Sequence, residues 1–212
     1  MTLPLILASQ SPRRKELLAQ IGYQFTTQAA DIDESVLGNE DASSYVERLA
    51  IEKARSVALT KVDAQASCIV LGSDTSVVID GEILGKPDSL NTCSKMLSKL
   101  SNNQHQVMTS IAAVKVMQGK IVEQLSQVVT TNVTFKALTA QEIERYWQTG
   151  EPCDKAGAYG IQGIASQFVT NIDGCYFAVV GLPLYATAQL LAKIGMPTPI
   201  QDVAANQSKD NG

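Results

Sequence analysis

The sequence has little of what several common kinds of functional site require. It contains one His, one Trp and only 5% aromatic residues. A Ser-His-Asp triad would have to be built around His105, and the segment HQVMTS is typical of the start of a strand. We therefore interpret His105 as structural. The four cysteines, Cys68, Cys93, Cys153 and Cys175, are scattered without a C-x-x-C pair, so free, partly buried thiols are expected and a zinc site is not.

The chain also lacks an excess of positive charge and a long hydrophobic run. Lys and Arg number 17 against 21 Asp and Glu, a net charge of −4, which has the wrong sign for holding a nucleic-acid backbone. The apolar stretches are far shorter than the ~20 residues of a membrane span. The apolar start has no basic region before it and does not resemble a signal peptide. We expect a cytoplasmic protein with no nucleic-acid partner and no membrane association.

Length and composition favour one globular domain. Dividing 212 residues by a typical ~150 gives roughly 1.4 domains, and 45% hydrophobic with 18% charged residues is ordinary for a soluble chain. No internal repeat or low-complexity linker interrupts the sequence. We predict a single domain over residues 1–196 and a flexible C-terminal tail over 197–212, polar from Gln201 onward.

Local signals predict helices mixed with hairpins. The apolar run LPLILA predicts a strand, followed by a helix with Ser11 as N-cap, Pro12 as its first residue and Gly22 as its stop. Further helices are predicted at 42–59, 89–100, from the capping box of Thr139 and Glu142 to near 150, and at 183–194. Asp-Gly at 80–81, Gln-Gly at 118–119 and Asp-Gly at 173–174 each separate strand-like runs. The expected fold is α/β or mixed α+β, with a central mixed sheet covered by helices.

A cluster of cations occupies the first turn of the first helix. Arg13, Arg14 and Lys15 lie where the helix dipole already disfavours positive charge. A phosphate bound there would be held by free N–H groups, by the hydroxyls of Ser9 and Ser11 and by the arginine side chains. A solvated basic turn fits the same spacing, and the sequence alone does not separate the two.

Two acidic features are candidates for a metal or a base. Asp74 lies between the apolar runs IVLG and SVVI, which would bury it at the end or edge of a strand near a compensating cation or metal; a turn aspartate is the simpler alternative. Asp31, Asp33 and Glu34 form a second cluster whose oxygens suit Mg²⁺ or Mn²⁺. Alone, such a cluster is more often an exposed loop.

Two glycine-containing segments resemble nucleotide loops without matching them. GEILGKP has three residues between its glycines where a Walker A loop has four, and a proline follows Lys86 where Ser or Thr is required. GAYGIQG spaces its glycines every third residue, unlike a dinucleotide fingerprint. It predicts a loop in which backbone approaches a ligand closely, with Gln162 offering an amide donor and acceptor.

Together these segments resemble one known family. LASQSPRRKELL, DIDE, RLAIEKA, LGSDTSVVIDGEILGKP, DKAGAYGIQG and VVGLPL occur in the order seen in Maf-like nucleoside triphosphate pyrophosphatases, from Leu5 to about Ile194. The resemblance implies a Maf or inosine-triphosphatase-like fold and a homodimer. It also implies hydrolysis of a nucleoside triphosphate between its α and β phosphates, with Mg²⁺ or Mn²⁺ as cofactor. SPRR, DT and GIQG are similar to the branch acting on dTTP and UTP.

The resemblance also implies roles for individual residues. Asp74 matches the family's proton acceptor, and Arg13, Thr75 and Gln162 match its specificity positions. Lys53 and Lys86 resemble its phosphate-binding lysines, and Glu34 resembles its acidic metal-side residue. From their chemistry we add Ser9 and Arg14 as substrate contacts and Asp74 as a second metal ligand. Ser73 and Gln10 depart from the residues usual in this branch, but neither is a proposed catalytic group.

The chemistry of the residues agrees with this assignment. Hydrolysis of a triphosphate requires cations, a metal and an oriented water more than covalent catalysis, and the Gln162 amide complements the imide edge of uracil or thymine. The alternative is a nucleotide-binding regulator of cell division and septum formation without significant turnover. The retained Asp74 favours catalysis, because binding alone gains nothing from a base beside the phosphates.

Overall fold

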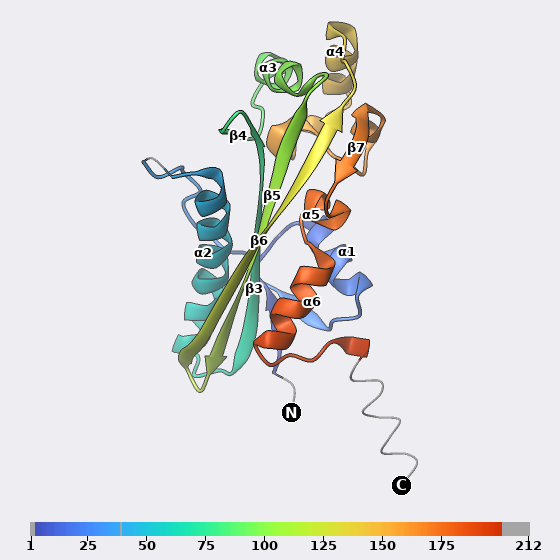
Figure 1. The fold of residues 1–212 in the computed structure, drawn as a ribbon. Coiled ribbons are helices and arrows are strands. Elements are labelled where there is room, and N and C mark those ends of the chain that lie inside the picture. The colour runs from blue at the N-terminus through green and yellow to red at the C-terminus, as the bar shows by residue number, and fades with distance from the viewer. Residues whose placement is uncertain (1–2, 39, 201–212) are drawn as a thin grey trace.

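The computed structural model describes residues 3–38 and 40–200 (Figure 1). In this part of the chain seven strands form one mixed sheet in the order β2-β1-β3-β5-β6-β7, with β4 also paired to β3. The strands are β1 Leu5–Leu7, β2 Phe25–Thr27, β3 Cys68–Ile79, β4 Glu82–Leu84, β5 Gln104–Met117, β6 Lys120–Phe135 and β7 Val169–Asp173. The predicted mixed sheet covered by helices is confirmed.

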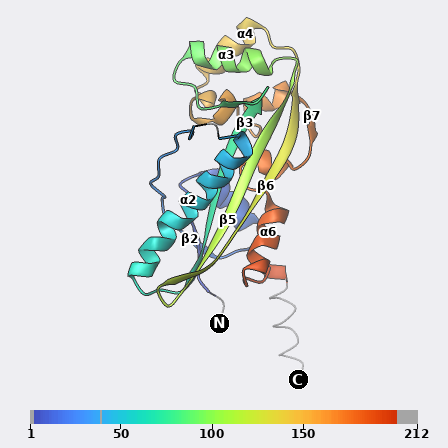
Figure 2. The ribbon, with the colours of Figure 1, turned by 60° about the vertical axis from the view of Figure 1, so that its left-hand side comes forward.

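The helices form a layer on each face of the sheet. They are α1 Pro12–Gln20, α2 Ala42–Asp63, α3 Leu90–Leu100, α4 Ala140–Gln148, α5 Tyr176–Val180 and α6 Leu184–Lys193, with 3-10 turns η1 Glu151–Asp154, η2 Ala156–Ala158 and η3 Ile164–Phe168. Figures 1 and 2 show α2 along one face and α1, α5 and α6 on the other, while α3 and α4 lie at one end. No described helix is long and apolar enough to cross a membrane.

Alternation along the strands divides the core between these two layers. Ile6 and Val70 face α2 in one buried cluster, whereas Leu7 and Leu71 belong to the larger cluster on the opposite face. Because successive side chains of a strand point to opposite faces, β1, β3 and β5 each contribute buried residues to both clusters. The sheet is therefore buried on both faces at these strands, whereas β6 and β7 are more exposed.

One edge of β3 changes partner halfway along the strand. β1 pairs in parallel with Ile69–Leu71, and β4 pairs antiparallel with Val77–Ile79. Because β5 pairs with the opposite edge of β3 throughout, β1 and β4 share one edge and leave residues 72–76 uncovered between them. This gap contains Asp74 in the middle of β3. Of the two predicted positions, the end or the edge of a strand, the structure shows the edge, because Asp74 lies within β3 beside an open stretch of backbone.

Most of the predicted local signals are confirmed. Ser11 caps α1 with Pro12 as its first residue, and Thr139 forms the capping box of α4 with Glu142. At 80–81 and 118–119 both turn residues of each pair have positive φ, as tight two-residue hairpins require. α2 extends to Asp63, beyond the predicted end at residue 59. The part of the predicted tail from 201 to 212 lies outside the described residues.

The segment after Gly174 differs from its prediction. The run YFAVV was expected to be a strand and instead forms the five-residue helix α5. Short apolar runs fit a strand and a buried helical turn equally well, and the choice here follows the neighbours. Gly174 and Gly181 have φ of 134° and 127°, conformations that favour glycine and interrupt an extended chain at both ends.

The cysteines and His105 agree with their predictions. All four cysteines are free, with Cys68 and Cys93 buried. His105 is buried and its Nε2 lies 2.9 Å from the Tyr159 hydroxyl. Burial lowers the pKa of His105 to about 4, so the imidazole is neutral in the folded protein. This supports a structural interpretation of His105.

Candidate active site

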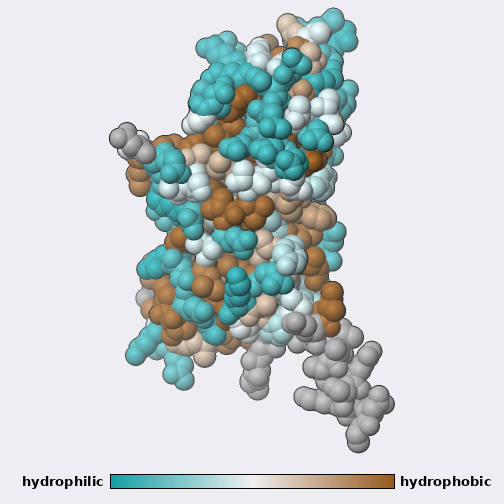
Figure 3. All heavy atoms as spheres, viewed as in Figure 1, coloured by the Kyte–Doolittle hydropathy of each residue, from teal (hydrophilic) through white to brown (hydrophobic). Residues whose placement is uncertain are grey.

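A cleft of about 990 Å³ opens beside the uncovered edge of β3. Its lining includes every site residue predicted from the sequence: Ser9, Arg13, Arg14, Glu34, Lys53, Asp74, Thr75, Lys86 and Gln162. They come from the β1–α1 junction, the loop before α2, α2 itself, β3, the β4–α3 connection and the loop after η2. On the face drawn in Figure 3, hydrophilic residues cover most of the upper part and hydrophobic residues gather across the middle.

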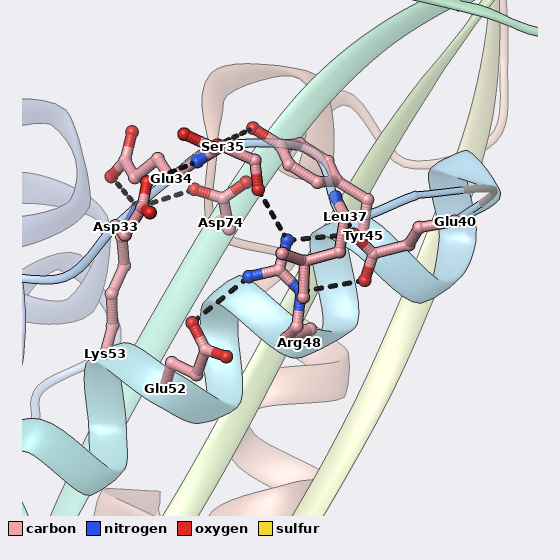
Figure 4. A network of polar contacts seen from close by, with 10 residues as sticks. All are labelled: Asp33, Glu34, Ser35, Leu37, Glu40, Tyr45, Arg48, Glu52, Lys53 and Asp74. Atoms are coloured by element: carbon pink, nitrogen blue, oxygen red, sulfur yellow. Dashed lines mark hydrogen bonds and ion pairs between the residues drawn. The ribbon is translucent and has the colours of Figure 1, made fainter.

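Close packing of α2 on β3 brings Lys53 to Asp74. A Cβ at Gly72 would lie 2.3 Å from the Ala50 carbonyl oxygen, so only glycine allows the helix this near to the strand. Lys53 follows Ala50 by almost one helical turn, and its Nζ lies 2.6 Å from Asp74 Oδ1 (Figure 4). Both side chains are largely buried. The compensating cation expected beside a buried Asp74 is therefore Lys53.

Glu34 approaches the same ammonium from the loop before α2. Glu34 Oε1 lies 2.7 Å from Lys53 Nζ, and the Tyr45 hydroxyl donates to the Glu34 carbonyl oxygen at 2.9 Å (Figure 4). Burial raises the pKa of Glu34, but the hydrogen bond and charge of Lys53, helped by Lys86 and Arg14, outweigh it and the pKa is lowered. Glu34 is consequently ionised at neutral pH.

Arg48 holds this loop against the helix. Its guanidinium contacts Glu40 at 2.8 Å and Glu52 at 3.2 Å, and donates to the Ser35 carbonyl oxygen at 3.0 Å (Figure 4). The Glu40 and Arg48 side chains are mostly buried, where charge-assisted hydrogen bonds are strongest. The position of Glu34 therefore depends on an ion-pair network that sequence reasoning did not identify.

The two carboxylates fit a hard divalent cation. Glu34 and Asp74 offer oxygen donors at an open cleft, and no group of three or more His, Cys, Asp or Glu side chains suited to a metal occurs among the described residues. Mg²⁺ and its relatives need only one or two carboxylates, because water and substrate phosphate complete their coordination. The donor set thus suits Mg²⁺ or Mn²⁺ shared with a phosphate ligand, and does not suit a structural zinc.

The two arginines of α1 are engaged differently. Arg14 Nε donates to the Gly181 carbonyl oxygen at 2.9 Å and Nη2 to Thr75 Oγ1 at 3.2 Å. Burial lowers the pKa of Arg14, a shift that the carboxylate of Asp74 opposes. Arg13 has only a 4.0 Å ion pair with the exposed Asp154, which is worth little in water. Arg13 is therefore the freer of the two for a ligand.

The hydrogen bonds around Thr75 fix the direction in which its hydroxyl donates. Thr109 Oγ1 donates to the Ala178 carbonyl oxygen at 2.7 Å and also lies 3.0 Å from Thr75 Oγ1. A hydroxyl carries one hydrogen, so Thr109 must accept the hydrogen of Thr75. Thr75 Oγ1 also accepts from Arg14. What Thr75 offers the cleft is therefore a remaining acceptor lone pair, which suits a ligand donor.

The remaining predicted residues differ in how far they are buried. Ser9 is buried and its Oγ accepts from the Ser11 amide at 3.1 Å. Lys86 and Gln162 are both exposed. The loop of Gln162 is joined to the β4 side by a hydrogen bond from the Gly157 amide to the Gly85 carbonyl oxygen at 3.0 Å.

Two cleft-lining residues escaped sequence reasoning. Glu151 and Lys155 both contribute to the lining, and both press against the Gln162 loop: added Cβ atoms at Gly160 and Gly163 would lie 2.6 Å from Lys155 Cε and 2.3 Å from Glu151 Oε2. The glycine spacing predicted a close approach of the backbone to a ligand, and the close approach that the structure shows is to these two side chains. It did not indicate which side chains make that approach.

The arrangement combines a buried carboxylate with several cations. Asp74 lies beside Lys53, and the cleft around them is lined by Arg13, Arg14 and Lys86. Such a site attracts a polyanion and places a proton acceptor next to it, which is the requirement for attack by water on a phosphoanhydride.

Several known proteins resemble this chain. Residues 4–194 match the family model described as Maf-like protein. The chain is 62% identical over 192 residues to the dTTP/UTP pyrophosphatase of Colwellia psychrerythraea, covering 90% of this chain and 88% of that protein. Identity is 57% over 192 residues to the protein of the same name from Pseudoalteromonas translucida, covering 90% and 97%. A solved nucleoside-triphosphatase / dITP/XTP pyrophosphatase from Mycobacterium abscessus matches at 13% identity and a TM-score of 0.39, covering 65% of this chain and 76% of that one.

Proposed function

Since this chain belongs to the Maf-like protein family, we propose that it is a nucleoside triphosphate pyrophosphatase that hydrolyses dTTP and UTP to the monophosphate and pyrophosphate. Relatives that carry the name dTTP/UTP pyrophosphatase are 50–62% identical to it over about nine tenths of its length. The observation that carries the proposal is the Lys53 contact with Asp74 and Glu34 at 2.6 and 2.7 Å inside a cleft lined by cations.

In the proposed reaction Asp74 is the general base. Lys53 contacts Asp74 Oδ1, so Oδ2 faces no cation in that pair and accepts the proton of a water molecule. The water oxygen forms a bond to one phosphorus of the α–β anhydride, and the bond from that phosphorus to the bridging oxygen breaks. The electron pair stays on the bridging oxygen, which leaves as part of pyrophosphate or of the nucleoside monophosphate. Lys53, Arg13 and Lys86 stabilise the charge that spreads over the phosphate oxygens.

A divalent metal is part of the proposal. Glu34 and Asp74 would hold it, as their oxygen donors and the open cleft allow, and when bound it neutralises phosphate charge as a Lewis acid. Glu34 is kept ionised by its lowered pKa, so it remains a competent ligand at neutral pH. Lys53 keeps the two carboxylates close together before the metal and nucleotide arrive.

Selection of the nucleobase is assigned to Gln162, with Thr75 as a second contact. Gln162 offers an amide donor and acceptor to the imide edge of uracil or thymine. Thr75 presents an acceptor because its own hydrogen is donated to Thr109, so it suits a ligand N–H or O–H. Arg13 assists at the triphosphate.

A panel of nucleoside triphosphates assayed for pyrophosphate release with Mg²⁺ or Mn²⁺ tests this function. We expect the highest kcat/KM with dTTP and UTP, a monophosphate as second product, and loss of turnover with a chelator. Tight binding of dTTP or UTP without pyrophosphate release would favour the nucleotide-binding regulator instead. Release of inorganic phosphate alone would contradict cleavage at the α–β bond.

The assembly and the location of the protein belong to the same proposal. We propose that residues 1–196 act as one domain, that two copies form a homodimer in the cytoplasm, and that the protein binds no nucleic acid. The net charge of −4 supports the last point. Light scattering of the purified protein tests the dimer, whose mass would be twice that of the 22.7 kDa chain.

A further inference from the structure

The loop that carries Gln162 is tied to one carboxylate. Glu151 Oε2 accepts from the Ile164 amide at 2.7 Å and Oε1 from the Ala165 amide at 3.3 Å. Oε1 also accepts from the Tyr146 hydroxyl at 2.9 Å, and that hydroxyl in turn accepts from the Gly160 amide at 3.3 Å. Backbone amides on both sides of Gln162 are therefore connected to Glu151, directly or through Tyr146.

Gly160 and Gly163 lie so close to the Glu151 and Lys155 side chains that neither position has room for a Cβ. A Cβ at Gly163 would lie 2.3 to 2.5 Å from the three atoms of the Glu151 carboxylate group, and a Cβ at Gly160 would lie 2.6 Å from Lys155 Cε. Lys155 is itself anchored, because its Nζ donates to the Glu151 carbonyl oxygen at 2.8 Å. The loop backbone thus rests directly on the Glu151 and Lys155 side chains, without intervening side chains of its own.

We propose that Glu151 is the positioning residue that sets the base selectivity of Gln162. The exposed Gln162 amide has a definite place only if its backbone is fixed, and Glu151 fixes the backbone on both sides of it. Selectivity built on hydrogen bonds depends on such placement, because a displaced partner leaves a polar group unpaired. This inference rests on the proposed function, and it assigns Glu151 no contact with the nucleotide.

An ionised carboxylate is the side chain suited to this role. It accepts hydrogen bonds at both oxygens and donates none, which matches three donors pointing at it. Glutamine has nearly the same volume, but its NH₂ group would face either the Ile164 amide or the pair formed by Ala165 and Tyr146. Glu151→Gln therefore places a donor against a donor at one end of the loop while preserving the packing.

The test combines selectivity with a measurement that needs no nucleotide. For Glu151→Gln we expect faster amide hydrogen exchange at residues 160–165, unchanged exchange in β3, and a fall of about tenfold in the ratio of kcat/KM for UTP to that for CTP, the size of one lost hydrogen bond. In a Gln162→Ala background, Glu151→Gln should leave that ratio unchanged, since coupled residues are not additive. Glu144→Gln, the same substitution at an exposed position of α4, is the matched control and should change neither quantity.

Two results would overturn the proposal. One is unchanged exchange at residues 160–165 in Glu151→Gln, which would mean that the carboxylate does not fix the loop. The other is an equal loss of kcat/KM for UTP and CTP, which would make Glu151 a general structural residue. If the parent protein releases no pyrophosphate from any triphosphate, the proposed function fails on that separate observation. The exchange measurement still decides whether Glu151 positions the loop.

Discussion

The two sides of the cleft are built in different ways. On the sheet side, Asp74 and Lys53 come from the buried strand β3 and the long helix α2, and they contact one another at 2.6 Å. On the loop side, Gln162 is exposed and its position depends on hydrogen bonds to the backbone around it. The charged groups are thus arranged before a ligand arrives, whereas the selecting amide is placed by its backbone alone.

This difference has a physical basis. Charges buried in a protein must be paired or they destabilise the fold, so the sheet side has its counter-ions within reach. A neutral amide at the surface carries no such requirement and remains available to a ligand. Substitutions on the sheet side should therefore reduce the rate for every triphosphate, and those on the loop side should mainly change which triphosphate is preferred.

The largest effect is expected from Asp74→Asn on the sheet side. The amide is nearly isosteric but accepts no proton, and loss of a general base typically reduces the rate by ~10²–10⁴. The fold should survive, because Lys53 keeps Glu34 as a partner at 2.7 Å. The measurement is kcat for dTTP and UTP, with Asp80→Asn in the exposed hairpin turn as control. A variant retaining more than half of the parent rate would remove Asp74 from the role of base.

A smaller effect is expected from His105, which lies beneath the loop side through its contact with Tyr159. Its folded pKa is lowered by burial to about 4, against ~6.5 in an unfolded chain. The unfolded state therefore binds the proton more readily, so the stability that the neutral imidazole contributes is present above pH ~6.5 and decreases as the pH falls toward 4.

Urea unfolding at pH 7.5 and 4.5 measures this contribution. Between these two values we expect His105 alone to reduce the free energy of unfolding by about 2 to 3 kcal/mol. His105→Gln has no titrating ring, so its stability should fall by correspondingly less over the same interval. Identical pH dependence in the two proteins would mean that His105 is protonated in the folded state or is not buried.

The smallest effect is expected from Gln162→Glu on the loop side. The change replaces the amide donor by a second acceptor facing a carbonyl oxygen of uracil or thymine. Once the bound base covers them, the two acceptors are left unpaired at a cost of ~1–3 kcal/mol. The kcat/KM values for dTTP and UTP should fall further than that for CTP, whose amine can donate to the new carboxylate. A uniform decrease over the three substrates would show that Gln162 supports the loop without contacting the base.

Much of the local structure was predictable from the sequence. The cap at Ser11, the capping box at Thr139 and the hairpin turns at 80–81 and 118–119 all depend on interactions within about four residues. The predicted site residues also line one cleft, because each carries recognisable chemistry in a family-like segment, whereas Glu151, Lys155 and Arg48 were not identified. The error at 176–180 occurred where five apolar residues carry no local signal that separates a strand from a helical turn.

What only the tertiary structure decided is how those residues meet. The pairing of Lys53 with Asp74 requires α2 to pack against Gly72. Arg48 holds the loop that brings Glu34 to the cleft. The direction in which the Thr75 hydroxyl donates follows from its contact with Thr109. Glu151 reaches the amides of residues 13 and 14 positions further along the chain. The sequence by itself determined the turns, the caps and the chemical groups, because these depend on neighbouring residues. The contacts between distant segments were decided by the packing of two buried clusters on opposite faces of one sheet, and no short stretch of sequence encodes that packing.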